Sequence, residues 1–162
     1  MKPKVYLETS FISYLTGKLS SDLTKLQRQL SSQRWWADRR QYFDLFASQI
    51  LYKECLQGNQ EAARERSAIL HGIPVLSLNG RILEIAKRLV EGGPFPKKAD
   101  TDATHLAIAT VYGCEYLLTW NFKHINNAQI KRAATEIIQS YGYKPTTICT
   151  PEELMGSNAY EG

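Results

Sequence analysis

The sequence predicts one α/β domain in which a parallel sheet of about five strands lies between two layers of helices, a three-layer α/β/α sandwich. Short β-type runs alternate with helical segments along the chain, as they do where helical crossovers join parallel strands. The length of 162 residues suits a single domain and can bury a core without disulfides or a structural metal. With 43% hydrophobic and 22% charged residues, the composition is that of an ordinary globular protein. We expect the domain to span residues 1–156, followed by a C-terminal tail at 157–162.

The first half of the chain is expected to alternate between strands and helices. Thr9-Ser10 favours a helix start directly after the first β-type run. Ser21-Asp22 can cap a long helix in which leucines recur at helical spacing, and Gly58-Asn59 ends a later one. The expected elements are a strand at 4–7, a helix at 9–15, a helix from 21 towards 40, a strand at 41–47 and helices at 48–56 and 60–70.

The second half continues the same alternation. Asn79 is a suitable cap for a helix, and the glycines and prolines of 91–98 cannot continue that helix, so this segment is expected to be a loop. Pro151-Glu-Glu is typical of a helix start. The expected elements are a strand at 72–78, a helix at 81–90, a helix at 102–111, a strand at 114–120, a helix at 128–141, a strand at 146–150 and a helix from 151.

Cysteine usage argues against a disulfide framework and against a zinc site. The three cysteines, Cys55, Cys114 and Cys149, are widely separated and form no Cys-x-x-Cys pair. We expect three buried thiols in a reducing compartment. The chain has no apolar run of about 20 residues, and its first residues become acidic too early for a signal peptide. A cytoplasmic protein with no membrane segment is therefore expected.

The charge balance permits a polyanionic partner without requiring one. Twenty Lys and Arg residues against 16 Asp and Glu residues give a formal net charge of +4. This excess is smaller than a dedicated DNA-coating protein carries, so the charge alone does not identify a nucleic-acid-binding protein.

Candidate site residues follow from the expected fold, because an open α/β sheet binds its ligand beyond the carboxyl ends of the strands. This rule selects Glu8, Glu54, Asp102 and Asn121. Carboxylate and amide oxygens are ligands that suit Mg²⁺ or Mn²⁺, and without a cation such a group would repel itself. Taken singly, Glu54 could also be a solvated helix residue, Asp102 a first-turn acid and Asn121 a turn residue.

Four segments then resemble the PIN-domain nucleases, and within them the VapC-like toxins of type II toxin–antitoxin pairs. The resemblance extends from Val5 to about Leu154. The segments, in family order, are Tyr6-Leu-Glu-Thr-Ser-Phe-Ile, Ser48 to Glu54 with Gly58-Asn59, Asp102-Ala-Thr-His-Leu-Ala-Ile-Ala and Leu117-Leu-Thr-Trp-Asn-Phe-Lys-His-Ile. The family fold, a five-stranded parallel sheet flanked by helices, agrees with the alternation.

The resemblance implies a metal-dependent endoribonuclease with one or two Mg²⁺ or Mn²⁺ ions. The family's four acidic positions fall on Glu8, Glu54, Asp102 and Asn121, and its small hydroxyl residue falls on Ser10. Two positions depart from the commonest pattern. Glu8 is one methylene longer than aspartate, and Asn121 keeps an oxygen but loses a charge, which should weaken a second ion more than the first.

Several neighbouring residues have two interpretations. Asp100, two positions before Asp102, is either a helix N-cap or an acid that orients the ligands. His105 is expected to be a core residue, and Trp120 is either a core residue or a surface on which a base stacks. The basic residues around the site are candidates for contact with RNA phosphates. They are Lys97, Lys98, Lys123, Lys131 and Arg132.

Two functional hypotheses follow. The first, a toxin ribonuclease that cuts RNA, pairs with an antitoxin and forms a homodimer, takes its toxin role from the resemblance alone. The second is a weakened domain of the same fold that binds RNA or a protein partner without cutting. A phosphate-accepting receiver domain is disfavoured, because it would need adjacent acids after the first strand and a lysine after the last one.

Overall fold

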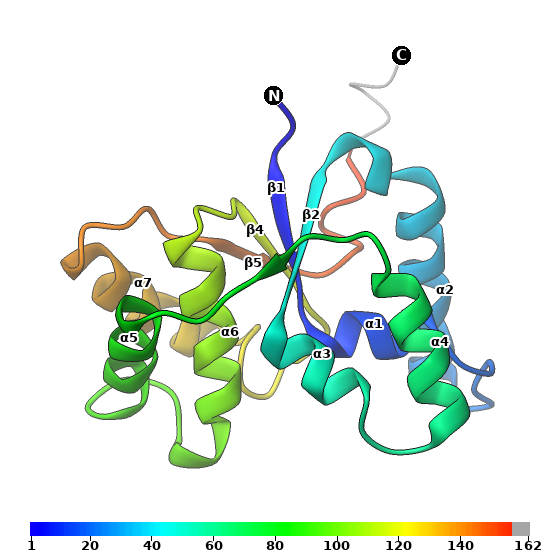
Figure 1. Ribbon diagram of the computed structural model, residues 1–162, viewed down its shortest axis with the longest axis horizontal. Coiled ribbons are helices and arrows are strands. Elements are labelled where there is room, and N and C mark those ends of the chain that lie inside the picture. The colour runs from blue at the N-terminus through cyan, green and yellow to red at the C-terminus, as the bar shows by residue number, and fades with distance from the viewer. Residues whose placement is uncertain (157–162) are drawn as a thin grey trace.

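A computed structural model describes residues 1–156 of the chain, and the predicted tail at 157–162 lies outside the described residues. Five parallel strands form one sheet in the order β3-β2-β1-β4-β5 (Figure 1). The strands are β1 (Lys4–Leu7), β2 (Asp44–Ser48), β3 (Val75–Leu76), β4 (Tyr116–Leu118) and β5 (Thr147–Cys149). The predicted parallel sheet of about five strands is thus confirmed.

Seven α-helices and two 3-10 helices connect the strands of the described chain. The α-helices are α1 (Thr9–Leu15), α2 (Leu23–Asp38), α3 (Gln49–Cys55), α4 (Gln60–Leu70), α5 (Gly80–Val90), α6 (Asp100–Val111) and α7 (Ala128–Ser140). The 3-10 helices are η1 (Arg40–Tyr42) and η2 (Lys97–Ala99). In residues 1–156, no helix combines the length and the apolar character needed to cross a membrane.

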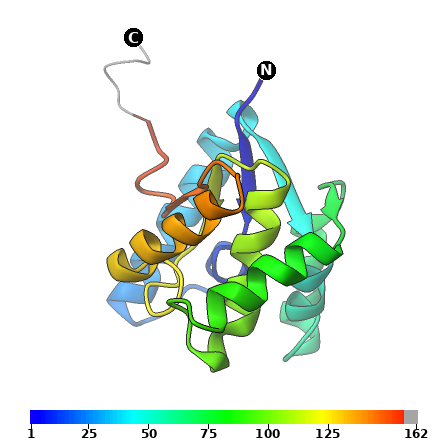
Figure 2. The same cartoon turned by 90° about the vertical axis from the view of Figure 1, so that its left-hand side faces the viewer.

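The helices cover both faces of the sheet and give the chain two apolar cores. Tyr6 points into a cluster with α5, α6 and α7, whereas Val5 and Leu7 point into a cluster with α1 to α4. This division follows from the alternation of side chains along a strand. Figure 1 shows the two groups of helices on opposite sides of the sheet, and Figure 2 shows α5, α6 and α7 from their own side. The three-layer sandwich is confirmed.

The centre of the sheet holds the segments that carry the candidate acids. β1 lies between β2 and β4, with Tyr6 opposite Phe46 on one side and opposite Leu117 on the other. The chain continues this pairing one residue beyond β1, because the backbone N–H of Glu8 donates to the Leu118 carbonyl at 3.1 Å. The carboxyl ends of β1 and β4 therefore lie next to each other, at the same end of the parallel strands.

Most helix starts are where the sequence predicted them. The side chains of Asp22, Asn59 and Asn79 each accept a hydrogen bond from a backbone N–H in the first turn of α2, α4 and α5. The start of α1 differs, because Glu8 rather than Thr9-Ser10 is the cap, and its carboxylate accepts from the Ser10 N–H.

Other predicted boundaries were wrong. The expected strand at 41–47 begins only at Asp44, because η1 occupies its first residues. The expected strand at 72–78 is only two residues long, at the edge of the sheet beside β2. The helix expected at 102–111 already starts at Asp100, and residues 151–155 form a turn instead of a helix.

The three cysteines are free and buried, as the sequence predicted. Burial raises the pKa of the Cys114 thiol and of the Cys149 thiol to about 12. Neither thiol is therefore ionised at neutral pH, which agrees with a purely structural role.

Gly93, just after α5, has no room for a side chain. A Cβ atom there would lie 2.2 Å from the carbonyl oxygen of Leu89 and 2.7 Å from that of Arg88. We expect Gly93→Ala to lower the free energy of unfolding by about 1–3 kcal/mol in urea denaturation, because backbone atoms must move. Gly80→Ala is the control, since its Cβ would meet open space and alanine favours the helix. Equal unfolding midpoints for the two variants would contradict this expectation.

Candidate functional site

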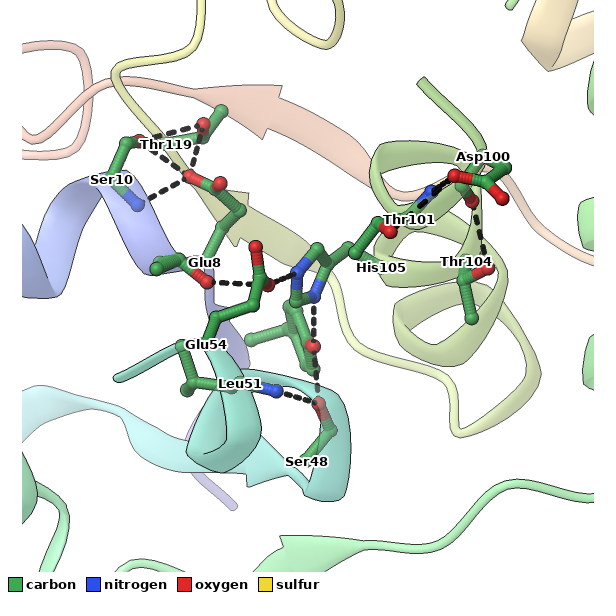
Figure 3. A network of polar contacts seen from close by, with 12 residues as sticks. Glu8, Ser10, Ser48, Leu51, Glu54, Asp100, Thr101, Thr104, His105 and Thr119 are labelled. Carbon is green, nitrogen blue, oxygen red and sulfur yellow. Dashed lines mark hydrogen bonds and ion pairs between the residues drawn. The ribbon is translucent and has the colours of Figure 1, made fainter. Parts of the chain in front are cut away.

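Glu8 lies at the carboxyl end of β1 and is almost completely buried, with 4% of its surface exposed. Its Oε2 atom accepts three hydrogen bonds (Figure 3). The donors are the Ser10 N–H at 2.9 Å, the Ser10 hydroxyl and the Thr119 hydroxyl at 2.8 Å. Ser10 in turn accepts from the Trp120 N–H at 2.8 Å, so α1 and the segment after β4 are joined through this carboxylate.

Glu54, in the last turn of α3, is held through its Oε1 atom. The Thr9 hydroxyl donates to this atom at 2.8 Å, and Nε2 of His105 lies 2.5 Å from it. The His105 ring is fully buried, and its Nδ1 lies 2.5 Å from the Tyr6 hydroxyl. That hydroxyl lies 2.7 Å from Oγ of Ser48, the N-cap of α3. Both ring nitrogens of His105 therefore have partners, and the ring links α6 to α3 and β1 (Figure 3).

Asp102 and Asn121 form the other side of the site. Nδ1 of His124 lies 3.3 Å from Oδ2 of Asp102. Oδ1 of Asn121 accepts from the His124 N–H at 3.0 Å, and the Asn121 N–H donates to the Thr119 hydroxyl at 3.0 Å. This hydroxyl also donates to Glu8, so a chain of contacts runs from Glu8 through Thr119, Asn121 and His124 to Asp102.

The four candidate residues thus belong to two groups of polar contacts, one that contains Glu8, Asn121 and Asp102 and one that contains Glu54. Asp102 and His105 lie three residues apart on α6, and His105 contacts Glu54. Within residues 1–156, however, no three His, Cys, Asp or Glu side chains lie close enough together to hold a metal ion as they stand.

The electrostatics of the three acids differ. Burial raises the pKa of Glu8, although the hydrogen bonds from Ser10 and Thr119 oppose this rise. Burial also raises the pKa of Asp102, and the nearby charge of Glu54 raises it further. Burial would raise the pKa of Glu54 as well, but His105 and Thr9 outweigh it, and the pKa lies below its usual range. The site therefore holds two acids, Glu8 and Asp102, whose ionisation burial disfavours, and one, Glu54, whose ionised form is favoured by its partners.

The donor set fits a hard divalent cation better than it fits a soft metal. Its members offer carboxylate and amide oxygens, and the cysteines are buried elsewhere, in the cores. A cation would also favour the ionised form of Asp102, whose pKa is raised by burial and, to a smaller extent, by the charge of Glu54. Within residues 1–156, the hydrogen bonds of Glu8 go to its Oε2 atom and those of Glu54 to its Oε1 atom, so each carboxylate keeps a second oxygen that could bind a ligand.

No protein-family model matches the chain, and no curated protein matches its sequence. Solved structures do match its fold. VapC20 of Mycobacterium tuberculosis, a toxin that cleaves the sarcin–ricin loop, is similar with a TM-score of 0.58 and 18% identity, covering 86% of this chain and 96% of its own. VapBC2 of Rickettsia felis, bound to a DNA fragment from its promoter, has a TM-score of 0.55 at 14% identity, covering 91% and 98%. VapBC-1 of nontypeable Haemophilus influenzae has a TM-score of 0.54 at 18% identity, covering 92% and 98%.

The chain has the PIN-like fold of VapC toxins. This finding confirms the fold that the sequence resemblance implied. At identities this low the VapC likeness establishes the fold alone, so the roles of Glu8, Glu54, Asp102 and Asn121 stay predictions.

The residues predicted to surround the candidate site lie at different places. Ser10 contacts Glu8 directly, as a residue that orients an acid would. Asp100 is exposed and accepts from the Thr101 N–H at 2.8 Å, while Ala99 occupies the N-cap position of α6, so its prediction as an N-cap was wrong. In Figure 3 it lies apart from Glu8 and Glu54.

The basic candidates lie around the ends of α6 and α7 and in the segment after β4. Four of their side chains are exposed, and the fifth, Lys131, is half-buried near β5. The exposed residues are Lys97, Lys98, Lys123 and Arg132. Their contact with RNA stays a prediction.

Sequence reasoning did not assign Thr9, Thr119, His105 or His124 to the site. Thr119 directly follows β4, so the strand-end rule could have selected it. His105 was expected in the core, and its complete burial confirms that expectation. Its spacing of three residues from Asp102 places both on one helix face, which was the available signal for a further role.

The buried charge of Glu8 leads to a prediction about pH. The pKa of Glu8 is higher in the folded state than in the unfolded state. Between these two pKa values the folded chain therefore binds more protons than the unfolded chain does. The free energy of unfolding consequently falls as the pH rises through the folded pKa. We expect Glu8→Gln to melt at a higher temperature than the parent at pH 7 in EDTA, and the difference to vanish below about pH 4. Calorimetry from pH 4 to 8 measures this, with exposed Glu136→Gln as the control. A lower melting temperature for Glu8→Gln at pH 7 would refute the prediction.

Proposed function

We propose that this protein is a ribonuclease that hydrolyses RNA phosphodiester bonds with the help of one or two divalent cations, Mg²⁺ or Mn²⁺. The observation that supports the proposal is that a chain of polar contacts joins Glu8, Asn121 and Asp102 beyond the ends of β1 and β4, while Glu54 is held by His105, three residues from Asp102 on α6. Open α/β sheets bind their ligands at the carboxyl ends of their strands, which is where these residues lie. The VapC-like fold is consistent with the same chemistry.

The oxygens of these four side chains would hold the cation. When bound, a divalent ion lowers the pKa of a water molecule and neutralises charge on the phosphate in the transition state. The hydrogen bonds around Glu8 and Glu54 would position their carboxylates for this role. Ser10 and Thr119 fix the Glu8 carboxylate, and Thr9 with His105 fixes that of Glu54, so neither acid has to be ordered when substrate arrives.

The wider proposal follows the VapC likeness. We propose that the protein is the toxin of a toxin–antitoxin pair, that it acts in the cytoplasm as a homodimer, and that an antitoxin protein restrains it. Two of the similar structures are VapBC assemblies, which supports a protein partner. The basic side chains of η2 and of the segment after β4 are candidates for gripping the RNA backbone.

The test is cleavage of an end-labelled structured RNA pool by purified protein. Reactions contain Mg²⁺, Mn²⁺ or EDTA, and an Asp102→Asn preparation made identically reveals contaminating nuclease. We expect cutting with either cation, none in EDTA and none by the variant. If the parent does not cut, or Asp102→Asn cuts equally well, the enzymatic proposal fails. A domain that binds RNA or a protein without cutting would then be the better account.

A further inference from the structure

The positively charged guanidinium of Arg28, in α2, lies against three aromatic rings next to the candidate site. The guanidinium carbon of Arg28 is 5.1 Å from the ring centre of Phe122, 5.7 Å from that of Tyr14 and 5.8 Å from that of Trp120. Its Nη1 donates to the Tyr14 hydroxyl at 3.2 Å. Among residues 1–156, no carboxylate pairs with Arg28. The side chain is thus positioned by rings instead of by an opposite charge.

The rings differ in what they can do. Trp120 is buried and donates through Nε1 to the Ser32 hydroxyl at 2.8 Å, so it is a core residue and not a surface for stacking. Phe122 is 44% exposed, which is unusual for so large an apolar side chain. Its ring centre lies 6.2 Å from that of Trp120, at a steep angle. Part of the Phe122 side chain is therefore open to solvent, although the ring is packed against Trp120 and Arg28.

This cluster is continuous with the candidate site. Trp120 and Phe122 are the two chain neighbours of Asn121, and the Trp120 N–H donates to Ser10, which contacts Glu8. Arg28 and Phe122 therefore lie against residues that themselves contact or adjoin the Glu8 and Asn121 part of the candidate site.

Resting on the proposed function, we propose that Arg28 and Phe122 form a subsite for one nucleotide of single-stranded RNA beside the cleaved bond. The Phe122 ring stacks on the base, and the guanidinium donates to a phosphate oxygen. Base stacking on aromatic rings combined with arginine contacts is a common physical basis of single-strand binding. Arginine suits this role because its planar fork matches a phosphate and its preorganisation lowers the entropy lost on binding.

The competing explanation is that Arg28 only packs α2 against the segment after β4. The two explanations differ in what each variant does to RNA binding. Arg28→Met keeps the aliphatic stem and removes the charge, and Phe122→Leu keeps an apolar side chain and removes the stacking face. Arg40→Met is the matched control, because Arg40 also lies over an aromatic ring, 4.8 Å from the centre of Trp36. Arg40 precedes β2 and so lies towards the amino end of the strands, away from the carboxyl ends at which the candidate site lies.

The experiment measures fluorescence anisotropy of a labelled 12-nucleotide single-stranded RNA, with all variants built on Asp102→Asn so that the probe stays intact. A second probe of equal length carries abasic positions. We expect Phe122→Leu to weaken binding of the normal probe about fivefold or more and to leave binding of the abasic probe unchanged. Arg28→Met should weaken both, and should reduce the slope of log K against log salt by about 0.7. Arg40→Met should bind as Asp102→Asn does.

Normal binding by both Arg28→Met and Phe122→Leu overturns the subsite and leaves the proposed function standing. An equal loss by Phe122→Leu on both probes also overturns it, since stacking would not be involved. If the Asp102→Asn parent binds no RNA at all, the proposed function fails and the subsite fails with it. Thermal unfolding of each variant shows whether it is folded. If Arg28→Met is misfolded, the comparison of Phe122→Leu on the normal and abasic probes decides whether the subsite exists.

Discussion

Replacing His105 with alanine is expected to lower the free energy of unfolding by about 3–5 kcal/mol, a large part of the stability of a typical domain. The ring is fully buried, so its removal leaves a cavity. It also leaves the Tyr6 hydroxyl and one oxygen of Glu54 without their ring partner. Urea denaturation followed by tryptophan fluorescence measures the loss, which should move the midpoint by about 1–3 M.

Two variants separate the parts of this effect. Tyr6→Phe nearly keeps the volume of the side chain and removes the hydroxyl that contacts the ring and Ser48, but it leaves no large cavity, so it should cost clearly less than His105→Ala. Thr104→Ala changes the neighbouring residue on α6, whose hydroxyl bonds only within its own helix, and should leave the midpoint nearly unchanged. An unfolding midpoint for His105→Ala equal to that of Thr104→Ala would show that the ring does not hold α6 against α3.

Glu54→Gln is expected to reduce RNA cleavage by about 100-fold or more while the chain stays folded. Glutamine keeps an oxygen that can accept from Thr9 and from His105, so the positioning contacts survive. What disappears is one negative charge of the set proposed to hold the cation. Initial rates of cleavage under saturating Mg²⁺ measure the loss, and the melting temperature reports the fold.

The matched control is Glu61→Gln, which makes the same chemical change at an exposed position in the first turn of α4. It should cleave RNA at the parent rate. Because the pKa of Glu54 is lowered, its ionised form stabilises the fold, and Glu54→Gln should lose some stability above the unfolded pKa, though less than His105→Ala. Cleavage by Glu54→Gln at the parent rate would remove this acid from the proposed machinery.

Local signals explain why much of the fold could be predicted from the sequence. Asp22, Asn59 and Asn79 cap their helices through contacts within three residues, so the sequence alone contains the information. The alternation of strands and helices predicted the layered parallel sheet for the same reason. Where tertiary contacts decide, the prediction failed, as at β3, whose length depends on its single neighbour β2.

The candidate site shows the same limit. The rule that ligands bind beyond strand ends selected Glu8 and Asn121 without knowledge of any contact. The burial of His105 followed from its apolar helix, but its contact with Glu54 joins residues 51 positions apart and depends on how α3 and α6 pack. Glu8 combines two roles, since a helix cap and a candidate ligand use the same carboxylate.

The parallel pairing of β1 with β4 also constrains when this edge of the sheet can exist during synthesis. Tyr6 pairs with Leu117, and the Glu8 N–H donates to the Leu118 carbonyl, so more than a hundred further residues must be synthesised after β1 before β4 can pair with it. Long-range pairing of this kind forms late and slowly. A ribosome-bound chain that has not yet released residues 116–121 therefore lacks the Glu8–Thr119–Asn121 connection altogether. The topology therefore delays the assembly of this part of the candidate site until residues 116–121 have left the ribosome.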